Sequence, residues 1–280
     1  MAEPHGELTC HVLDTGHCLA LEKHLIRGGR HRTVVCHSLV ALLGHPRQGW
    51  LLWDSGYAPR LWDATKRWPF RAYRWVTPLH LRPELAVVAQ LARFGLTADD
   101  VRRIVISHFH ADHVAGLRDF PKAELFASKA AYEDVAGRTG LRALWRAFVP
   151  ALLPDDFGRR VVLLPEFAGA ALDALGPTCD LFGDGSAVLV SLPGHARGQL
   201  GLLARTDRGK IFFVADSCWL SAAYRDNRPP ARITHLFMDD ATAMRTTLGH
   251  LHAFAHSHPD VAILPSHCPE AYEKYVGRAT

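Results

Sequence analysis

The segment HFHADH at residues 108–113 constrains this chain more than any other part of its sequence. Its imidazoles and its carboxylate are the ligands that a divalent metal such as zinc prefers. The apolar run at residues 104–106 is typical of a buried strand, and it ends at Ser107. A rigid sheet holds side chains in place at the end of a strand, which suits chemistry. The sequence therefore predicts a metal site in a loop that follows a strand of an α/β fold.

Other candidate ligands follow predicted strands far from this segment. His195 comes after Leu-Pro-Gly, Asp216 ends the run FVAD, and His267 ends the run AILPSH. Converging strand ends allow a scaffold to bring distant side chains into one site. The predicted metal ligands are His108, His110, Asp112, His113, His195, Asp216 and His267.

Size, charge and cysteine spacing exclude several classes of protein. A chain of 280 residues, 48% of them hydrophobic, can bury the core of one large domain. The formal charge is only +4 and the basic residues are spread along the chain, so no nucleic-acid partner is predicted. No apolar run approaches the roughly 20 residues that cross a bilayer, so no membrane partner is predicted. The six cysteines lack CxxC spacing and the polar start carries no secretion signal, which favours the cytoplasm.

Predicted strands and helices follow one another without a linker rich in glycine or serine. Two similar halves, each a sheet with covering helices, predict a four-layer αββα sandwich that forms a single domain over residues 1–280. Residues 57–82 mix aromatic and basic side chains and are predicted to be an insertion over the site. We expect this insertion to form an apolar wall of the site, with the interface of a homodimer or a simple core helix as the alternatives. Among the predicted helices are residues 83–96, 129–136, 141–153 and 240–258.

The ligand pattern resembles the complete metal set of the metallo-β-lactamase superfamily in its dinuclear form, over nearly the whole chain. The fold and a small acyl substrate follow from that resemblance as expectations. It implies a first metal held by His108, His110 and His195, a second held by Asp112, His113 and His267, and a bridge between them formed by Asp216.

Within this superfamily, residues 11–16 and 39–56 resemble the N-acyl homoserine lactonase branch. Asp54 resembles a carboxylate that orients metal ligands, and a plain turn is the alternative interpretation. In the well-known lactonases a tyrosine follows the bridging aspartate by three residues and donates a hydrogen bond to the substrate, whereas this chain has Trp219 there. An indole N–H can donate one hydrogen bond but has no hydroxyl. Trp219 is therefore a candidate substrate-binding residue. Tyr224, which lies close by in the sequence, is a second candidate that could replace the missing tyrosine.

Two metals in one site imply hydrolysis. Such a pair lowers the pKa of a water between the metals, polarises a carbonyl and stabilises the leaving oxygen. The resemblance implies that a metal-bridging hydroxide opens the ring of an N-acyl homoserine lactone, a quorum-quenching activity, and that Asp112 passes the proton to the leaving group. Zinc is the expected metal, with iron, manganese and cobalt as alternatives.

Other functions stay open from the sequence alone. A thioester hydrolase of the glyoxalase II type needs a basic pocket, which the arginines of residues 57–82 could supply. A two-iron oxidoreductase of this fold usually carries a flavin domain, which is absent from this sequence. A ligand-binding or regulatory member would keep its metals and show little turnover.

Overall fold

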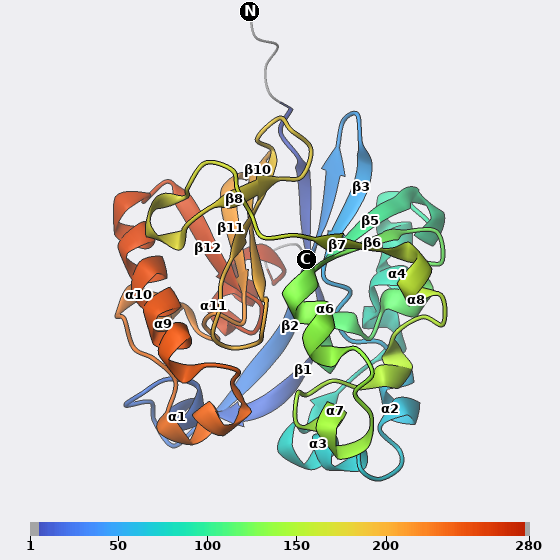
Figure 1. The fold of residues 1–280 in the computed structure, drawn as a ribbon, viewed down its shortest axis with the longest axis vertical. Coiled ribbons are helices and arrows are strands. Elements are labelled where there is room, and N and C mark those ends of the chain that lie inside the picture. Colours follow the sequence, from blue (N-terminus) through green and yellow to red (C-terminus); the bar gives the residue numbers. More distant parts are fainter. Residues whose placement is uncertain (1–5, 278–280) are drawn as a thin grey trace, which may run out of the picture.

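The computed structural model describes residues 6–277, which form two β-sheets packed face to face with helices on both outer sides (Figure 1). The predicted four-layer αββα sandwich is therefore confirmed. The first sheet has the strand order β4 (Leu79–His80), β1 (Thr9–Leu21), β2 (Thr33–His45), β3 (Gly49–Trp53), β5 (Val101–Ile106), β6 (Glu124–Ser128), β7 (Val161–Leu164). The second has the order β12 (Val261–Pro265), β11 (Gly209–Ala215), β10 (Leu200–Thr206), β9 (Ala187–Ser191), β8 (Thr178–Asp180).

Most helices of this chain are short. The longest, α10, covers the second sheet. The α-helices are α1 (Glu22–Leu25), α2 (Arg60–Ala64), α3 (Arg71–Val76), α4 (Val87–Gln90), α5 (Ala111–Val114), α6 (Lys129–Val135), α7 (Gly140–Leu144), α8 (Phe157–Arg160), α9 (Ser221–Arg225), α10 (Ala241–Ser257) and α11 (Pro269–Tyr275).

Strand direction decides where the loops of the site gather. β3, β5, β6 and β7 pair in parallel, so their carboxyl ends lie at one edge of the first sheet. Asp54 follows β3 and Ser107 follows β5, which places both at that edge. β11 and β12 are also parallel, and they lead into Asp216 and His267. Parallel pairing in both sheets thus delivers polar side chains to one end of the sandwich.

Apolar side chains from both sheets meet between them. Leu43 and Trp53 of the first sheet pack in one buried cluster with Leu202 and Phe213 of the second. Burial of side chains of this size contributes roughly 1.5–3 kcal/mol each to folding. This core fixes the distance between the two sheets and hence between the loops at their ends.

The predicted helix over residues 240–258 is present as α10. The carboxylate of Asp240 accepts hydrogen bonds from the backbone N–H groups of Thr242 and Ala243, which caps the first turn. Met244, Leu248 and Leu251 recur at helical spacing and are all buried. The predicted helix over residues 129–136 is also present, as α6.

Two other helix predictions were wrong about length. Residues 83–96 form η1 (Pro83–Leu85), α4 and η2 (Leu91–Phe94), because Ala86 is extended with a ψ of 140°. Residues 141–153 break after α7, because Ala147 adopts a φ of 46°. Trp145, in this segment, is 63% exposed. In both segments the apolar residues recur at helical spacing, but neither segment forms one continuous helix.

Residues 57–82 contain α2, α3 and the edge strand β4, which pairs with β1. The single domain and the insertion remain predictions. No helix within the described residues is both long enough and apolar enough to cross a membrane.

Candidate metal centre

The loop after β5 carries the dense part of the site. His108 and His110 lie in this loop, and α5 follows with Asp112 and His113 in its first turns. The strand–loop–helix order places four polar side chains within one short stretch that turns back on itself. His195 enters from the loop after β9.

The structure brings all seven predicted ligands together. They form three overlapping groups, and within each group the candidate ligand atoms lie within 4.8 Å of one another. The groups are His108, His110 and His195; His108, His113 and Asp216; and Asp112, His113 and His267.

Buried nitrogen atoms without hydrogen-bond partners test whether a metal fits here. His108 Nε2 and His113 Nε2 are buried and have no hydrogen-bond partner among the described residues. An unpartnered buried polar atom costs about 1–3 kcal/mol. A divalent metal would satisfy both nitrogens, and imidazole with carboxylate is the donor set that zinc accepts. The residues present therefore fit the metals that the site chemistry implies.

Asp216 lies between histidines on opposite sides. Its Oδ1 is 3.2 Å from His113 Nε2, and its Oδ2 is 3.3 Å from His195 Nε2 and 3.0 Å from His267 Nε2. Asp216 is therefore within reach of histidines from both predicted metal sets. The indole N–H of Trp219 donates a hydrogen bond of 3.0 Å to Oδ2. This bond orients Asp216 and occupies the single donor of the indole.

Asp54 makes hydrogen-bond contacts that hold candidate ligands in position. Its Oδ2 lies 2.8 Å from His113 Nδ1 and accepts a hydrogen bond of 2.7 Å from the Ser107 hydroxyl, while Oδ1 accepts from the Ser107 N–H. Ser107 Oγ in turn lies 3.0 Å from His108 Nδ1. A carboxylate on the far nitrogen fixes the orientation of a histidine ligand. The backbone of Asp54 has a φ of 59°, a conformation costly for residues other than glycine.

His267 receives similar support from the backbone, since its Nδ1 donates to the carbonyl oxygen of His37. That contact leaves Nε2 directed at Asp216 and Asp112, at 3.0 and 3.4 Å. The ring therefore has one orientation that serves both contacts.

Burial is the largest influence on the protonation of one part of the ligand set. Burial lowers the pKa of His110 to about 4 and that of His195 to about 3. Burial, together with neighbouring histidines, holds the pKa of His108 well below its usual value. These three imidazoles are neutral at pH 7, which is the form that binds a metal.

The other side of the site behaves in the opposite way. Burial lowers the pKa of His113, but the carboxylates of Asp54, Asp112 and Asp216 outweigh it and raise the pKa well above its usual value. His267 follows the same pattern, and its pKa rises to about 9. Burial raises the pKa of Asp216, but the adjacent histidines outweigh it and hold that pKa well below its usual value. The metal-free site therefore holds protons where a second metal would bind.

An apolar cavity of about 640 Å³ opens onto the ligands. Its wall includes His110, Asp112, Asp216 and His267, and no lysine or arginine is among its lining residues within 6–277. Aromatic or apolar side chains from distant segments form the rest of the wall, chiefly Tyr73, Leu141, Leu144, Trp145, Trp219, Phe237 and Met238.

Sequence reasoning missed Tyr73. It is the tyrosine that lines this cavity, and its hydroxyl stays protonated because burial and the nearby Asp112 carboxylate raise its pKa well above the usual value. The aromatic composition of residues 57–82 signalled a wall of the site, but nothing in it distinguished Tyr73 from its aromatic neighbours.

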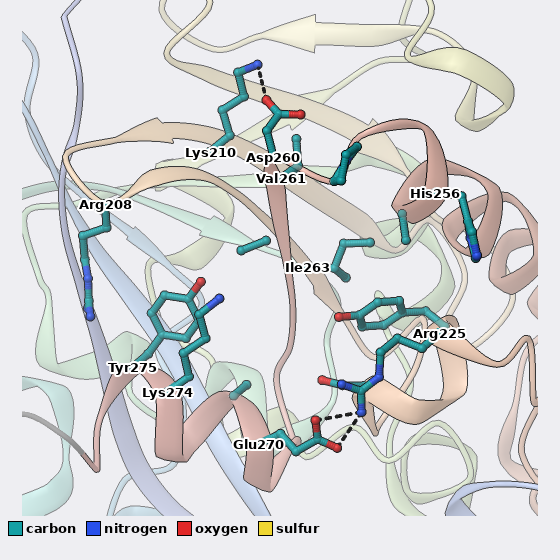
Figure 2. A pocket seen from close by; sticks show the side chains of 16 residues that line it. Arg208, Lys210, Arg225, His256, Asp260, Val261, Ile263, Glu270, Lys274 and Tyr275 are labelled. Carbon is teal, nitrogen blue, oxygen red and sulfur yellow. Dashed lines mark hydrogen bonds and ion pairs between the residues drawn. The ribbon is translucent and has the colours of Figure 1, made fainter.

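Tyr224 lies elsewhere. It lines a separate cavity of about 760 Å³ beside β11, β12 and α11 (Figure 2). Figure 2 shows two cations of that cavity already paired, Lys210 with Asp260 at 3.0 Å and Arg225 with Glu270 at 2.7 Å. The two cavities share no lining residue, so Tyr224 does not reach the ligands.

Comparison with known families agrees with this site. Residues 33–264 match the family described as Metallo-beta-lactamase superfamily, which covers most of the chain. The chain belongs to the metallo-β-lactamase superfamily. The predicted class of metal-dependent hydrolase is confirmed with it, because the similar proteins are metallo-hydrolases and lactonases.

Relatives in this superfamily place the chain near one branch. It is 27% identical over 256 residues to a probable metallo-hydrolase, Rv2300c, of Mycobacterium tuberculosis, covering 86% of this chain and 76% of the relative. It is 25% identical over 231 residues to the N-acyl homoserine lactonase AiiB of Agrobacterium fabrum, covering 81% and 78%. The predicted resemblance to the lactonase branch is thus confirmed.

A solved structure supports the same fold. The N-acyl homoserine lactone hydrolase with N-hexanoyl-L-homoserine at its catalytic metal centre superimposes with a TM-score of 0.71. The match covers 96% of both chains at 16% sequence identity. At that identity the similarity concerns the fold.

Proposed function

We propose that this metallo-β-lactamase member opens the ring of N-acyl homoserine lactones by hydrolysis, with two divalent metals in its site. The apolar cavity that ends on the candidate ligands carries the proposal. A substrate whose carbonyl reaches the ligands must lay its remaining length along apolar side chains, which suits an acyl chain. Relatives named N-acyl homoserine lactonases support the choice of substrate.

The proposed metal sites use every candidate ligand. Bound there, the metals would supply a nucleophilic water at neutral pH and polarise the substrate carbonyl. The first would be held by His108, His110 and His195, the second by Asp112, His113 and His267, and Asp216 would contact both.

Protein groups supply the remaining chemistry. Asp112 lines the cavity with a side chain that is 13% exposed, so its carboxylate reaches a substrate and can hand a proton to the departing ring oxygen. Trp219 cannot serve the substrate in this arrangement, because its only donor is bonded to Asp216. We assign orientation of the substrate carbonyl to the Tyr73 hydroxyl, which lines the cavity together with Asp112.

The same cavity disfavours the thioester alternative. A glutathione thioester carries carboxylates, and their recognition needs cations. The lining contains no lysine or arginine within the described residues. The arginines of residues 57–82 that had suggested such a pocket do not line the cavity.

Zinc, a quorum-quenching role and a cytoplasmic location are finer parts of the proposal. Zinc is supported by the imidazole-rich donor set. The cytoplasm is supported by the six cysteines, which are all free.

Ring opening by the zinc-loaded protein is the decisive measurement. Short-chain and long-chain N-acyl homoserine lactones should both open, with the long chains giving the lower KM because they fill the apolar cavity. His110→Ala is the inactive control, and Tyr73→Phe should raise KM while leaving metal content unchanged. If the protein hydrolyses thioesters but no lactones, the proposed substrate is wrong. If it binds two metals and hydrolyses neither, a ligand-binding role is favoured.

A further inference from the structure

Exposed apolar side chains gather around the mouth of the cavity. Within residues 6–277, every large apolar side chain that is more than half exposed belongs to residues 57–82, 139–146 or 228–238. We call these three stretches the mouth segments. Large exposed apolar areas on soluble proteins commonly mark binding sites. Its members are Trp68, Trp75, Val76, Leu141, Trp145, Ile233, Leu236 and Phe237.

The three mouth segments form one surface with the cavity. Val76, Leu141, Trp145 and Phe237 are exposed and also line the cavity. The rings of Trp145 and Phe237 lie 6.2 Å apart, which links two of the segments directly. Figure 1 shows α3, α7 and the chain between α9 and α10 at the same end of the molecule, the bottom of the view.

Basic residues outnumber acidic residues in the mouth segments. The mouth segments hold ten lysines and arginines and one acidic residue, Asp63. The whole chain has 32 basic and 28 acidic residues, so the remainder has 22 and 27. Within the described residues, no ion pair involves Lys66, Arg67, Arg71, Arg74, Arg142 or Arg232. The other four, Arg60, Arg82, Arg146 and Arg228, pair with carboxylates outside the mouth segments, so six basic side chains and one acidic side chain of these segments are left.

We propose that the mouth segments dock on the surface of an anionic phospholipid membrane. Tryptophan with aliphatic side chains beside arginine and lysine is the composition that enters the headgroup region of a bilayer. Each basic residue near an anionic leaflet contributes about 1 kcal/mol. The sequence had suggested no membrane partner because no segment spans a bilayer, but docking at the surface needs no span.

Other occupants fit this face less well. A two-fold dimer would set the same basic surface against itself, so like charges would meet across the interface. Single-stranded RNA would stack on the tryptophans, but it would leave Val76, Leu141, Ile233 and Leu236 exposed. A bilayer satisfies both the aliphatic and the basic side chains.

Docking in this orientation turns the mouth of the cavity toward the bilayer. A substrate with a long acyl chain partitions into lipid, so the chain could pass from the membrane into the cavity without crossing water. The docking proposal does not depend on the identity of the substrate.

Sedimentation with lipid vesicles tests it. The full chain should bind vesicles of phosphatidylcholine mixed with phosphatidylglycerol, bind phosphatidylcholine alone at least about tenfold more weakly, and lose binding as salt rises. Trp68→Ser with Trp75→Ser, and separately Arg67→Gln with Arg71→Gln, should each weaken binding about tenfold or more. None of these four residues lines the cavity.

Matched controls separate docking from general effects. Val162→Ser removes an exposed apolar side chain on β7, and Arg102→Gln removes an exposed cation at the start of β5, the strand end away from the ligand loop. Both should bind vesicles as the parent does, and circular dichroism with metal content should confirm that every variant is folded.

Absence of binding to anionic vesicles, or equal binding by all variants, would overturn the proposal. So would a dimer in sedimentation velocity that the tryptophan variant dissociates, or tighter binding of single-stranded RNA than of vesicles. Vesicle binding is measured without turnover, so it can fail or succeed independently of the lactonase proposal.

Discussion

The metal centre and the mouth segments lie at two ends of one cavity, and they are built on opposite principles. In the centre, His108 and Asp54 are buried, and their contacts to Ser107 and His113 fix their orientation. Around the mouth, Trp75 and Leu141 are exposed and few contacts fix them. Chemistry depends on geometry held within a fraction of an ångström, whereas surface contact depends on area and charge. Substitutions should therefore have large and specific effects at the centre and small effects on the folded state at the mouth.

The largest effect is expected at Asp216. Asp216→Asn keeps the shape but removes the charge that faces His113, His195 and His267. Metal content should fall from two per chain, and kcat/KM should fall by about a thousandfold or more, because the metals supply most of the catalysis. Elemental analysis with lactone hydrolysis measures both. Retention of two metals by this variant would contradict the role of Asp216 as a bridge.

Affinity for the second metal should depend steeply on pH. Asp112 and Asp216 help raise the pKa of His113 and His267, to about 9 for His267, so both imidazoles are protonated at pH 7 without metal. A metal that displaces about two protons gains about a hundredfold in affinity per pH unit below these pKa values. Zinc titration calorimetry in buffers of different ionisation enthalpy counts the released protons. Release of none would mean that these histidines are neutral before binding.

Removing a residue that positions a ligand should lower metal affinity less than removing a ligand itself. Asp54→Asn weakens the contact to His113 Nδ1 and should lower metal affinity about 10- to 100-fold. Asp184 offers a matched control, because it lies 2.9 Å from His45 Nε2 in a similar pair that has no part in the site. Competition with a chelator would measure the difference, and equal losses in both variants would make Asp54 a structural residue only.

A smaller effect is expected at Trp219. Trp219→Phe removes the N–H that orients Asp216 and should lower metal affinity by about tenfold, near the lower limit for such partners. Trp145→Phe is the control, since Trp145 lines the same cavity and makes no hydrogen bond to a ligand. Should Trp219→Phe change only KM for the substrate, the indole would act on the substrate instead.

At the mouth, the expected change in stability is near zero. Trp75→Ser removes a side chain that is 69% exposed and should alter the free energy of unfolding by less than about 0.5 kcal/mol. Leu248→Ala, in the buried face of α10, should cost about 2–5 kcal/mol. Urea unfolding of the two variants sharpens the contrast, and a large loss for Trp75→Ser would show that the mouth is part of the packed core.

The sequence predicted the metal centre better than the surroundings of the cavity. The ligands at residues 108–113 are local in the chain, and His195, Asp216 and His267 each follow a strand, so the strand pattern pointed to them. Asp54 came from the resemblance to the superfamily, with a plain turn as the alternative, and the structure places it beside His113.

Features that depend on packing could not be predicted. The broken helix after α7 turns on the backbone of Ala147, and no periodicity of side chains signals its positive φ. Trp219 was identified, but its bond to Asp216 depends on how the loop after β11 folds back. The distance between Tyr224 and the site likewise depends on α9 facing a different cavity.

The protonated pair His113 and His267 has a consequence for the order of assembly. In a folded chain without metal, the carboxylates of Asp54, Asp112 and Asp216 face these two imidazolium rings, which offset two of the three negative charges. Protons would therefore occupy the proposed second metal site before a metal binds. We expect the sandwich to fold first and take up metal afterwards, so that metal supply would limit the activity of this protein more than its folding.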